Sequence, residues 1–351
     1  MRRRQLLALG VGLTVVGCSR SEPPSGGSAP SPSGNTSSSA PSPSGRLTLA
    51  VIPKGTTHEF WKSVHAGAVK ASRELDVDIV WKGPLKEDDL KSQIDLVQSF
   101  TAQHVSGIVL APLNDKALVS SVNGAVTAGI PVVIFDSALS GGNITSFVAT
   151  DNRAAGALAA QHLAKLAQTS SAGPDKVVVL RYQEGSASTR DREEGFLEGI
   201  AKAGAQFSVV SSNQYGGATT ESAFKAAERL LLAQNAAAGG VTAIFTPNES
   251  TTFGMLLALQ KAQLAGKVKF VGFDVSDKLL AGVEQQQIDG LVLQNPFNMG
   301  YLAVRAVVDR LRGKSVEART DTGAVVVDRN NLREPSIVEL VKPDLQKWLG
   351  P

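Results

Sequence analysis

Polar side chains follow most of the short apolar runs in this sequence, close to the point where each run ends. Carboxylates, amides, a hydroxyl and a lysine occur there, and an arginine lies nearby. The candidate residues are Lys54, Asp136, Ser137, Gln183, Arg192, Asn248, Asp274 and Gln294. Vicinal hydroxyl groups donate and accept hydrogen bonds at once, so a polyol site needs carboxylates to accept, amides to do both and an arginine to donate. We therefore expect a small polyhydroxylated ligand, although Asn248 and Asp274 could each be a helix cap instead.

The turn after the first apolar run adds two adjacent aromatic side chains. Residues 51–68 read VIPKGTTHEFWKSVHAGA, a strand followed by a helix, and contain Lys54, His58, Phe60 and Trp61. A sugar ring presents an apolar C–H face that a flat aromatic covers while it excludes water from the surrounding hydrogen bonds. Phe60 and Trp61 are candidates for that contact and Lys54 for a hydroxyl or a carboxylate. Core packing on the helix is the alternative for both aromatics.

Motifs of common enzyme classes are missing from the positions where they act. No G-x-S-x-G, G-x-x-x-x-G-K-[ST] or G-x-G-x-x-G motif follows any predicted strand. The four histidines are scattered, so we expect no metal site and no cofactor. Asp136 and Asp274 could serve in acid–base catalysis, but no side chain is placed as a nucleophile beside them. The sequence therefore favours a binding protein over an enzyme.

The elements that would position these residues alternate along the chain. Short β-branched runs are followed by polar turns and then by amphipathic stretches of helical length. The runs cover residues 47–52, 77–81, 107–111, 131–135, 176–180, 207–211, 242–246, 269–273 and 290–294. Continuous apolar runs indicate strands that helices cover on both faces, so the alternation predicts an α/β fold with doubly wound parallel sheets. Ligands bind such sheets beyond the carboxyl ends of the strands, where the candidate residues lie.

The N-terminal residues predict export and a lipid anchor. Three arginines at positions 2–4 precede an apolar run, residues 6–17, that is too short to span a bilayer and is typical of a signal peptide. The run ends at Cys18 in a motif that looks like a lipobox, so we expect residues 1–17 to be a lipoprotein signal peptide and Cys18 to carry a lipid. The arginines also fit a twin-arginine export signal. Residues 18–45 are almost all serine, proline and glycine and predict a disordered tether.

Charge and cysteine content exclude nucleic-acid binding and an internal disulfide, and length predicts the number of domains. The chain has 35 basic and 32 acidic residues, and three of the basic ones lie in the leader, so the mature protein is near neutral. It therefore lacks the basic surface expected of a nucleic-acid-binding protein. Cys18 is the only cysteine, which excludes a disulfide within the chain. The roughly 306 residues that follow the tether are more than a single hydrophobic core usually accommodates, so we expect two domains.

Five stretches, taken together and in order, resemble a known family. They are VSGIVLAPLNDKALVSSVNGAVTAGIPVVIFDS (105–137), FVATDNRAAGALAAQHLA (147–164), EGSASTRDREEGFLEGI (184–200), FTPNESTTFGMLLAL (245–259) and VGFDVSDKLLAGVEQQQIDGLVLQNPFNMG (271–300). From residue 46 to about residue 335 the chain resembles the type I periplasmic solute-binding proteins of sugar ABC importers, in particular the ribose-binding-like group. The resemblance implies two lobes joined by a three-segment hinge, with the ligand held between them.

The same resemblance implies a domain division and partners. The hinge segments would fall near Thr150, Gln294 and Thr322, so each lobe is discontinuous in sequence. Lobe 1 would contain residues 46–149 and 295–322, and lobe 2 residues 150–294 and 323–351. We expect an extracytoplasmic monomer that delivers its ligand to an ABC permease in the membrane. The alternative is a receptor that presents a sugar or an autoinducer-like signal to a membrane sensor.

Departures from the ribose-type pattern bear on the ligand. Matched position by position, the resemblance implies ligand contacts at Phe60, Trp61, Asp136, Arg192, Asn248, Asp274 and Gln294. Ribose-type sites have an asparagine where His58 and Ala111 stand and an arginine where Ser137 stands. Lys54 instead resembles the lysine of rhamnose-binding and furanosyl autoinducer-binding members, which contacts ligand in this turn. We therefore expect a deoxysugar, a sugar acid or an autoinducer-like furanose, and not ribose.

Overall fold

The computed structural model describes residues 45–167 and 173–350. The predicted signal peptide, the lipid site at Cys18 and nearly all of the tether lie outside these residues. Within them, no helix combines the length and the apolar character needed to cross a membrane.

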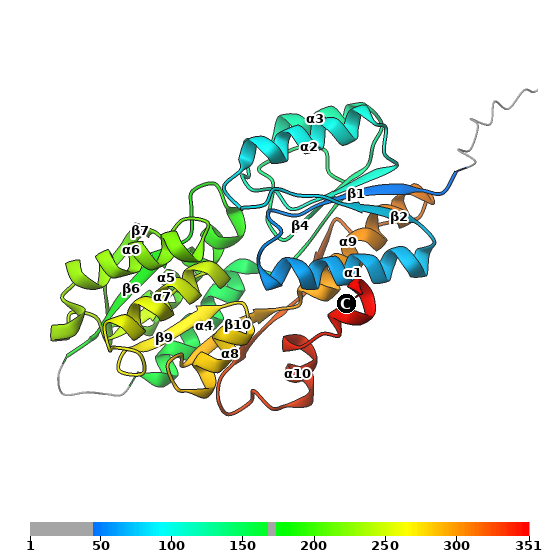
Figure 1. The fold of residues 1–351 in the computed structure, drawn as a ribbon. Helices are drawn as coiled ribbons and strands as arrows, with labels where there is room; N and C mark the ends of the chain where they lie inside the picture. Colours follow the sequence, from blue (N-terminus) through cyan, green and yellow to red (C-terminus); the bar gives the residue numbers. More distant parts are fainter. Residues whose placement is uncertain (1–44, 168–172, 351) are drawn as a thin grey trace, which may run out of the picture. The chain divides into compact units, whose positions relative to one another are not determined.

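Two six-stranded sheets form the folded part of the chain (Figure 1). The first sheet runs in the order β11 (Arg319–Asp321), β5 (Ser146–Ala149), β4 (Val132–Phe135), β3 (Gly107–Leu110), β1 (Thr48–Ile52) and β2 (Asp78–Trp81). The second runs in the order β12 (Ala324–Val327), β10 (Gly290–Gln294), β9 (Lys269–Phe273), β8 (Ala243–Phe245), β6 (Asp175–Arg181) and β7 (Phe207–Tyr215). All neighbouring strands are parallel except β10 and β12. The predicted fold class, two doubly wound parallel sheets, is confirmed.

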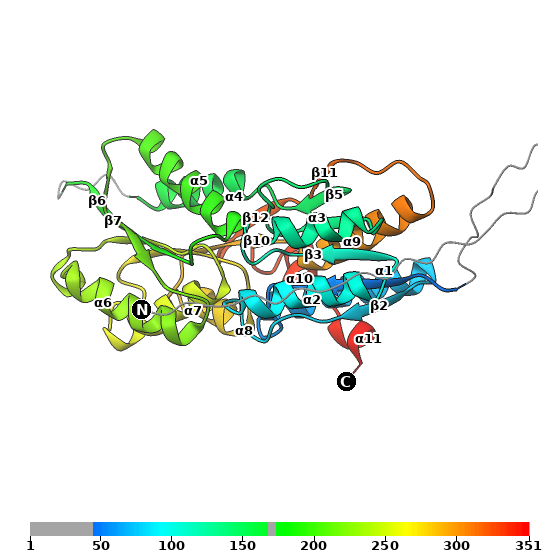
Figure 2. The ribbon, with the colours of Figure 1, turned by 90° about the horizontal axis from the view of Figure 1, so that it is seen from above.

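Helices cover both faces of the first sheet, lying above it and below it in Figure 1, and Figure 2 looks down on the upper helices. Leu49 and Val51 of β1 face α1 (Glu59–Leu75) and α9 (Pro296–Leu311), whereas Ala50 and Ile52 face α2 (Leu90–Ala102) and α3 (Val119–Thr127). These four strand residues are at most 1% exposed. Burial on both faces explains why these four consecutive residues are all apolar and do not alternate with polar ones.

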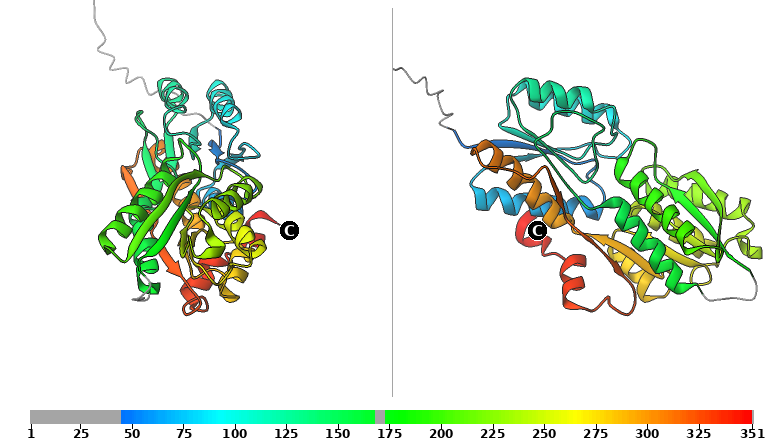
Figure 3. Two further views of the ribbon diagram at one scale, coloured as in Figure 1. Left: turned by 90° about the vertical axis from the view of Figure 1, so that its left-hand side faces the viewer. Right: turned by 180° about the vertical axis from the view of Figure 1, so that it is seen from behind.

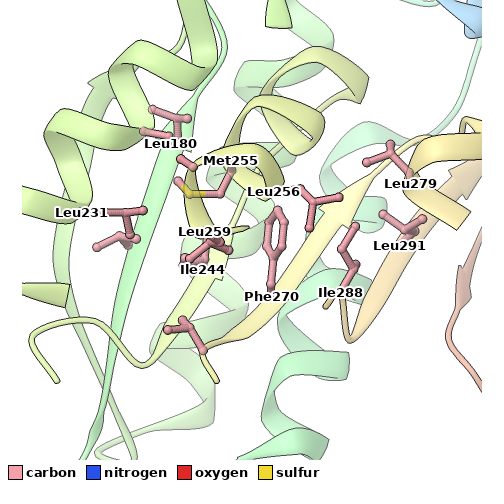
Figure 4. Close-up of a cluster of buried hydrophobic side chains, with 14 of the residues drawn as sticks. Leu180, Leu231, Ile244, Met255, Leu256, Leu259, Phe270, Leu279, Ile288 and Leu291 are labelled. Atoms are coloured by element: carbon pink, nitrogen blue, oxygen red, sulfur yellow. The ribbon is translucent and has the colours of Figure 1, made fainter. Parts of the chain in front are cut away.

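The second sheet repeats this arrangement, and Figure 3 shows its helices from the side and from behind. One face packs on α4 (Asn152–Leu166) and α5 (Ala187–Ala203). The other packs on α6 (Thr220–Ala233), α7 (Glu249–Lys261) and α8 (Asp277–Glu284), and a short 3₁₀ helix, η1 (Ala236–Ala238), follows α6. Figure 4 shows this core, in which Met255 and Leu259 of α7 lie against Ile244 and Phe270 of the sheet.

Close packing of α1 on α9 sets the position of the first helix. A Cβ atom built on Gly67 would lie 1.8 Å from the backbone oxygen of Phe297, and one on Gly300 would lie 2.1 Å from that of Val64. Only glycine allows the two helix backbones to approach this closely. Because α9 returns to the first sheet from the end of β10, this contact fixes α1 beside a point where the chain passes between the sheets.

The chain passes between the two sheets after β5, after β10 and between β11 and β12. Two of the passages are joined by the Thr150 hydroxyl, which lies 3.3 Å from that of Thr322 and donates to the carbonyl of Gly323 at 3.2 Å. These are the places where the resemblance put the hinge segments.

The C-terminal residues differ from the expected division, which assigned residues 323–351 to lobe 2. Helix α10 (Pro335–Val341) does pack on the second sheet, through Ile337. Helix α11 (Leu345–Leu349), however, lies against α1 of the first sheet. Arg73 donates hydrogen bonds to the carbonyls of Lys347 (3.3 Å) and Trp348 (2.9 Å), and its guanidinium lies 5.5 Å from the Trp348 ring. The guanidinium of Arg73 on α1 therefore helps to hold the end of the chain on the first sheet.

Candidate functional site: a polar cleft between the sheets

Two aspartates occupy corresponding positions at the cleft, one in each sheet. Strands β4 and β9 hold equivalent places in the two sheet orders, and each ends in a phenylalanine followed by Asp136 or Asp274. Both aspartates have positive φ angles, 60° and 66°, and both are buried. Aspartate tolerates this left-handed region better than most residues, and such strained backbones concentrate at functional sites. The two strand ends thus aim a carboxylate from each sheet at one cavity.

This cavity lies between the carboxyl ends of the strands of the two sheets. Its lining residues are Lys54, His58, Phe60, Trp61, Glu87, Asp136, Tyr182, Ser188, Thr189, Arg192, Asn248, Glu249, Asp274 and Gln294. They include nine of the eleven candidate residues; Ser137 and Gln183 are the exceptions. The cavity measures about 30 Å³, far below the ~300–1,000 Å³ typical of ligand pockets. A ligand of monosaccharide size therefore requires the two sheets to move apart before it can enter.

Lys54 supplies a buried positive charge on the first sheet's side of the cavity. Its Nζ lies 2.8 Å from Asp136 Oδ2 and donates a 3.0 Å hydrogen bond to the Ser188 hydroxyl. The side chains of Lys54 and Asp136 are only 4% and 5% exposed. A buried charge needs such an opposite partner, and here the partner is itself a candidate ligand contact.

Arg192 supplies the positive charge on the other side. From α5, its Nε donates to Asn152 Oδ1 (2.8 Å) and its Nη1 to the carbonyl of Pro247 (2.9 Å). The guanidinium stacks 4.0 Å from the Phe273 ring centre, and Nη1 lies 3.9 Å from Asp274 Oδ2. Burial lowers the pKa of Arg192, and the neighbouring carboxylates act in the opposite direction. These contacts hold the planar group in one orientation.

Among the residues that the structure describes, two polar atoms at this end of the cavity find no hydrogen-bond partner. They are Nη2 of Arg192 and Oε1 of Gln294, a donor and an acceptor, and both are buried. The other end of the Gln294 amide is engaged, because its Nε2 donates to Asp274 Oδ1 at 2.7 Å. Burial raises the pKa of Asp274, while Arg192 and Gln294 counteract that rise. Buried polar atoms are almost always paired, so an unpaired donor and acceptor facing one cavity suit a ligand that carries hydroxyl groups.

The aromatic residues and His58 gather around Glu87. Its Oε1 accepts a hydrogen bond from Trp61 Nε1 (2.7 Å) and lies 2.7 Å from His58 Nδ1. Burial lowers the pKa of His58, but Glu87 outweighs burial and raises it to about 9. Burial likewise raises the pKa of Glu87, but His58 outweighs it and lowers it to about 2. The pair is therefore ionised at neutral pH, and the imidazolium donates to the carboxylate.

Core packing, the alternative for the aromatics, applies mainly to Trp61. The Trp61 side chain is 3% exposed and packs edge-on against Phe135 with ring centres 6.2 Å apart. Phe60 is only partly buried and meets Trp61 edge-on at 4.9 Å. Both residues line the cavity, but Phe60 is the freer of the two to cover a sugar face.

Asn248 is a helix cap, as the alternative interpretation held. Its side chain accepts from the backbone N–H of Thr251 at 3.3 Å and begins α7, while its Nδ2 donates to the Ser250 hydroxyl. Asp274 does not cap α8, because Ser276 takes that role. Asp274 Oδ2 instead accepts from the backbone N–H of Glu249 at 3.0 Å.

Ser137 and Gln183 join the two sheets outside the cavity. The Ser137 hydroxyl accepts from the backbone N–H of Ser188 (3.1 Å), and Gln183 Nε2 donates to the backbone oxygen of Glu87 (2.8 Å).

The lining residues that sequence reasoning missed are Glu87, Tyr182, Ser188, Thr189 and Glu249. Tyr182 and Glu249 lie next to residues that were singled out, so a wider reading of the strand ends would have found them. Glu87 lies six residues beyond β2, where the sequence offers no comparable signal.

Residues 49–315 match the periplasmic binding protein domain family. This chain belongs to that family. Two curated relatives are the D-allose-binding periplasmic protein of Escherichia coli, 29% identical over 74% of this chain and 83% of the relative, and the ribose import binding protein of Haemophilus influenzae, 28% identical over 80% and 91%. The family resemblance seen in the sequence is thus confirmed.

Solved structures agree with the family assignment. A periplasmic component of an ABC-type sugar transport system from Hahella chejuensis is 35% identical, with a TM-score of 0.75, over 80% of this chain and 100% of that chain. A solute binding protein from Agrobacterium vitis with bound D-fucose is 32% identical, with a TM-score of 0.78, over 84% and 100%. One from Agrobacterium radiobacter in complex with D-arabinose is 30% identical, with a TM-score of 0.80, over 85% and 99%. Periplasmic binding proteins bind solutes outside the cytoplasm and are not enzymes, which confirms the expectation of a binding protein.

Proposed function

We propose that this chain is the lipid-anchored sugar-binding component of an ABC importer. It takes one small polyhydroxylated ligand in the cavity between its two lobes, which close around a three-segment hinge. Lobe 1 contains residues 46–149 and 295–322, and lobe 2 contains residues 150–294 and 323–341, with α11 returning to lobe 1. The relatives named for D-allose and ribose, and the solved structures that hold D-fucose and D-arabinose, support a sugar as the ligand.

This proposal rests mainly on one observation, the buried hydrogen-bond donors and acceptors that line the cavity. Asp136 and Asp274 offer acceptors from the two lobes, while Nη2 of Arg192 and Oε1 of Gln294 lack partners. Asp136 Oδ2 is paired with Lys54 Nζ at 2.8 Å, so on the lobe 1 side a charged acceptor and a charged donor lie together at the cavity. Vicinal hydroxyls can satisfy acceptors and donors in such a mixed set, whereas an apolar ligand would leave them all unpaired.

Contacts between the lobes surround the cavity and support closure as the binding motion. Lys54 and Ser137 of lobe 1 both bind Ser188 of lobe 2. At the rim, Arg190 donates to Asp115 Oδ2 at 2.8 Å, and the backbone N–H of Asp115 donates to the carbonyl of Gly185 at 2.9 Å. A ligand that touches both lobes stabilises this arrangement in proportion to its preference for it over the open one.

The lobe 1 side of the cavity supports a ligand other than ribose. Lys54 and His58 bring two cations to positions where they are already paired with Asp136 and Glu87. A deoxysugar, a sugar acid or a furanose of the autoinducer type would use this combination better than ribose. D-fucose, the deoxysugar bound to one of the relatives, is a natural member of the test panel.

The leader supports the cellular part of the proposal. A signal peptide over residues 1–17 and a lipid on Cys18 would hold the protein at the outer face of the membrane, with residues 18–45 as a tether. From there a monomer would deliver its sugar to an ABC permease.

A thermal-shift screen of residues 19–351 tests the proposed ligand class. The panel contains pentoses, hexoses, deoxysugars, sugar acids and polyols, and apolar compounds of similar size serve as controls. A ligand that binds only the folded protein raises Tm by mass action, by an amount that grows with its concentration. At least one polyhydroxylated compound should raise Tm in this way. A panel without any such shift would refute a sugar ligand.

A further inference from the structure

Glu87 is a buried carboxylate that contacts both lobes. It lies in the loop between β2 and α2 and is 6% exposed. Within lobe 1, its Oε1 is held by Trp61 and His58 at 2.7 Å each. From lobe 2, the hydroxyl of Tyr182 donates to its Oε2 at 2.7 Å, and Gln183 Nε2 donates to its backbone oxygen at 2.8 Å.

The two sets of partners have different consequences when the lobes part. His58 and Trp61 stay with Glu87, because all three belong to the same lobe, so the carboxylate remains charged and oriented. Tyr182 and Gln183 move away with lobe 2. Tyr182 is 1% exposed, so its hydroxyl is shielded from water while the lobes are closed. It comes into contact with water each time the lobes open. A hydrogen bond to a buried, charged acceptor is stronger than one between neutral groups.

We propose that Glu87 and Tyr182 form a latch that sets the balance between open and closed lobes. His58 and Trp61 orient the carboxylate in advance, and the Tyr182 hydroxyl engages it only when the lobes meet. The latch thereby adds to the affinity for the sugar by slowing its release. Glu87 also holds the Trp61 ring at the cavity, so it acts as a positioning residue. The latch rests on the proposed function in one respect, that closure is the binding motion.

Other contacts between the lobes are less suited to this role. The Arg190–Asp115 pair is buried only on the side of the aspartate, because the side chain of Arg190 is 43% exposed and that of Asp115 is 4% exposed, and contact with water weakens an ion pair. The Lys54–Ser188 bond belongs to a lysine that also faces the ligand. The Glu87–Tyr182 bond is buried, short and charged.

The test measures lobe closure directly, with and without sugar. Residues 19–351 contain no cysteine, so Lys91→Cys on α2 and Lys225→Cys on α6 introduce two specific labelling sites, on side chains that are 84% and 61% exposed. Single-molecule energy transfer between the labels reports the open and closed populations. Stopped-flow mixing with D-allose, D-ribose, D-fucose or D-arabinose gives the association and dissociation rate constants.

Tyr182→Phe removes only the hydroxyl, and Glu87→Gln removes the charge. Each should shift the sugar-free protein toward the open population and raise the dissociation rate constant about tenfold, as expected for loss of a hydrogen bond to a charged group. The association rate constant should barely change. The double variant should be no worse than Glu87→Gln alone, because both changes break one interaction. Tyr215→Phe, at an exposed tyrosine of the same lobe, is the matched control and should leave every value unchanged.

Three results would overturn the latch. The first is that the parent protein has no closed population before sugar is added. The second is that Tyr182→Phe has the same populations and dissociation rate constant as the parent. The third is that the effects of the two substitutions are strictly additive in the double variant. A separate outcome distinguishes the latch from the proposed ligand. If no sugar binds the parent but Tyr182→Phe still shifts its populations, the latch is correct and the ligand class is wrong.

Discussion

Removing the charge of Lys54 should destabilise the protein far more than removing a surface lysine. The side chains of Lys54 and Asp136 are 4% and 5% exposed, with Nζ and Oδ2 2.8 Å apart. Breaking a buried pair by removing one partner leaves an uncompensated charge and costs about 3–5 kcal/mol. Lys54→Met should therefore lower Tm by roughly 5–10 °C. Differential scanning calorimetry of residues 19–351 at pH 7 measures the change.

A double variant separates the ion pair from simple loss of packing. Asp136→Asn in the Lys54→Met background removes the stranded carboxylate charge, so the double variant should recover much of the lost stability. Lys91→Met is the matched control, because Lys91 pairs with Asp95 on an exposed helix face and its loss should cost less than about 1 kcal/mol. If Lys54→Met is as mild as Lys91→Met, or if the two cleft substitutions add without coupling, the buried pair does not act as described.

Three further predictions concern other parts of the molecule. Burial raises the pKa of Glu249 from 4.5 to about 7 where the lobes meet, so closure takes up a proton. Sugar affinity measured by calorimetry should therefore be highest below about pH 4.5 and fall as pH rises from there through about 7. Glu249→Gln should flatten this profile, and an unchanged profile would show that the assignment is wrong. Gly67→Ala would place Cβ 1.8 Å from the Phe297 oxygen and should cost about 1–3 kcal/mol in denaturant unfolding; an unchanged midpoint would contradict the close helix contact. Cys18→Ser should release the full-length protein from membranes in a fractionation assay, and continued retention would refute the lipid anchor.

The sheets were predictable because burial on both faces leaves a local signature. Residues 49–52 and 132–135 are apolar at every position, since neighbouring side chains point to opposite, equally buried faces. Parallel strands then bring their carboxyl ends to one edge. That geometry is why Asp136, Asp274 and Gln294, far apart in sequence, were expected together and line one cavity.

The features that the sequence did not reveal depend on contacts between distant segments, where a loop or a terminus folds back onto the rest of the chain. Glu87 reaches the cavity from a loop whose path no local pattern specifies, and its importance comes from partners on both lobes. Ser137 and Gln183 stand at strand ends like the lining residues, yet they face the other lobe's backbone. The position of α11 on α1 rests on a few contacts around Arg73, which sequence distance conceals.

The most direct test of the central claim is a calorimetric titration of residues 19–351 with the sugar that gives the largest thermal shift. We expect one site per chain. We also expect Arg192→Lys and Gln294→Leu each to weaken binding about 30-fold or more, close to 2 kcal/mol, because hydroxyls of the ligand lose a donor or an acceptor that has no partner among the described residues. Binding of equal strength in the parent and in both variants would contradict the placement of the site between the lobes.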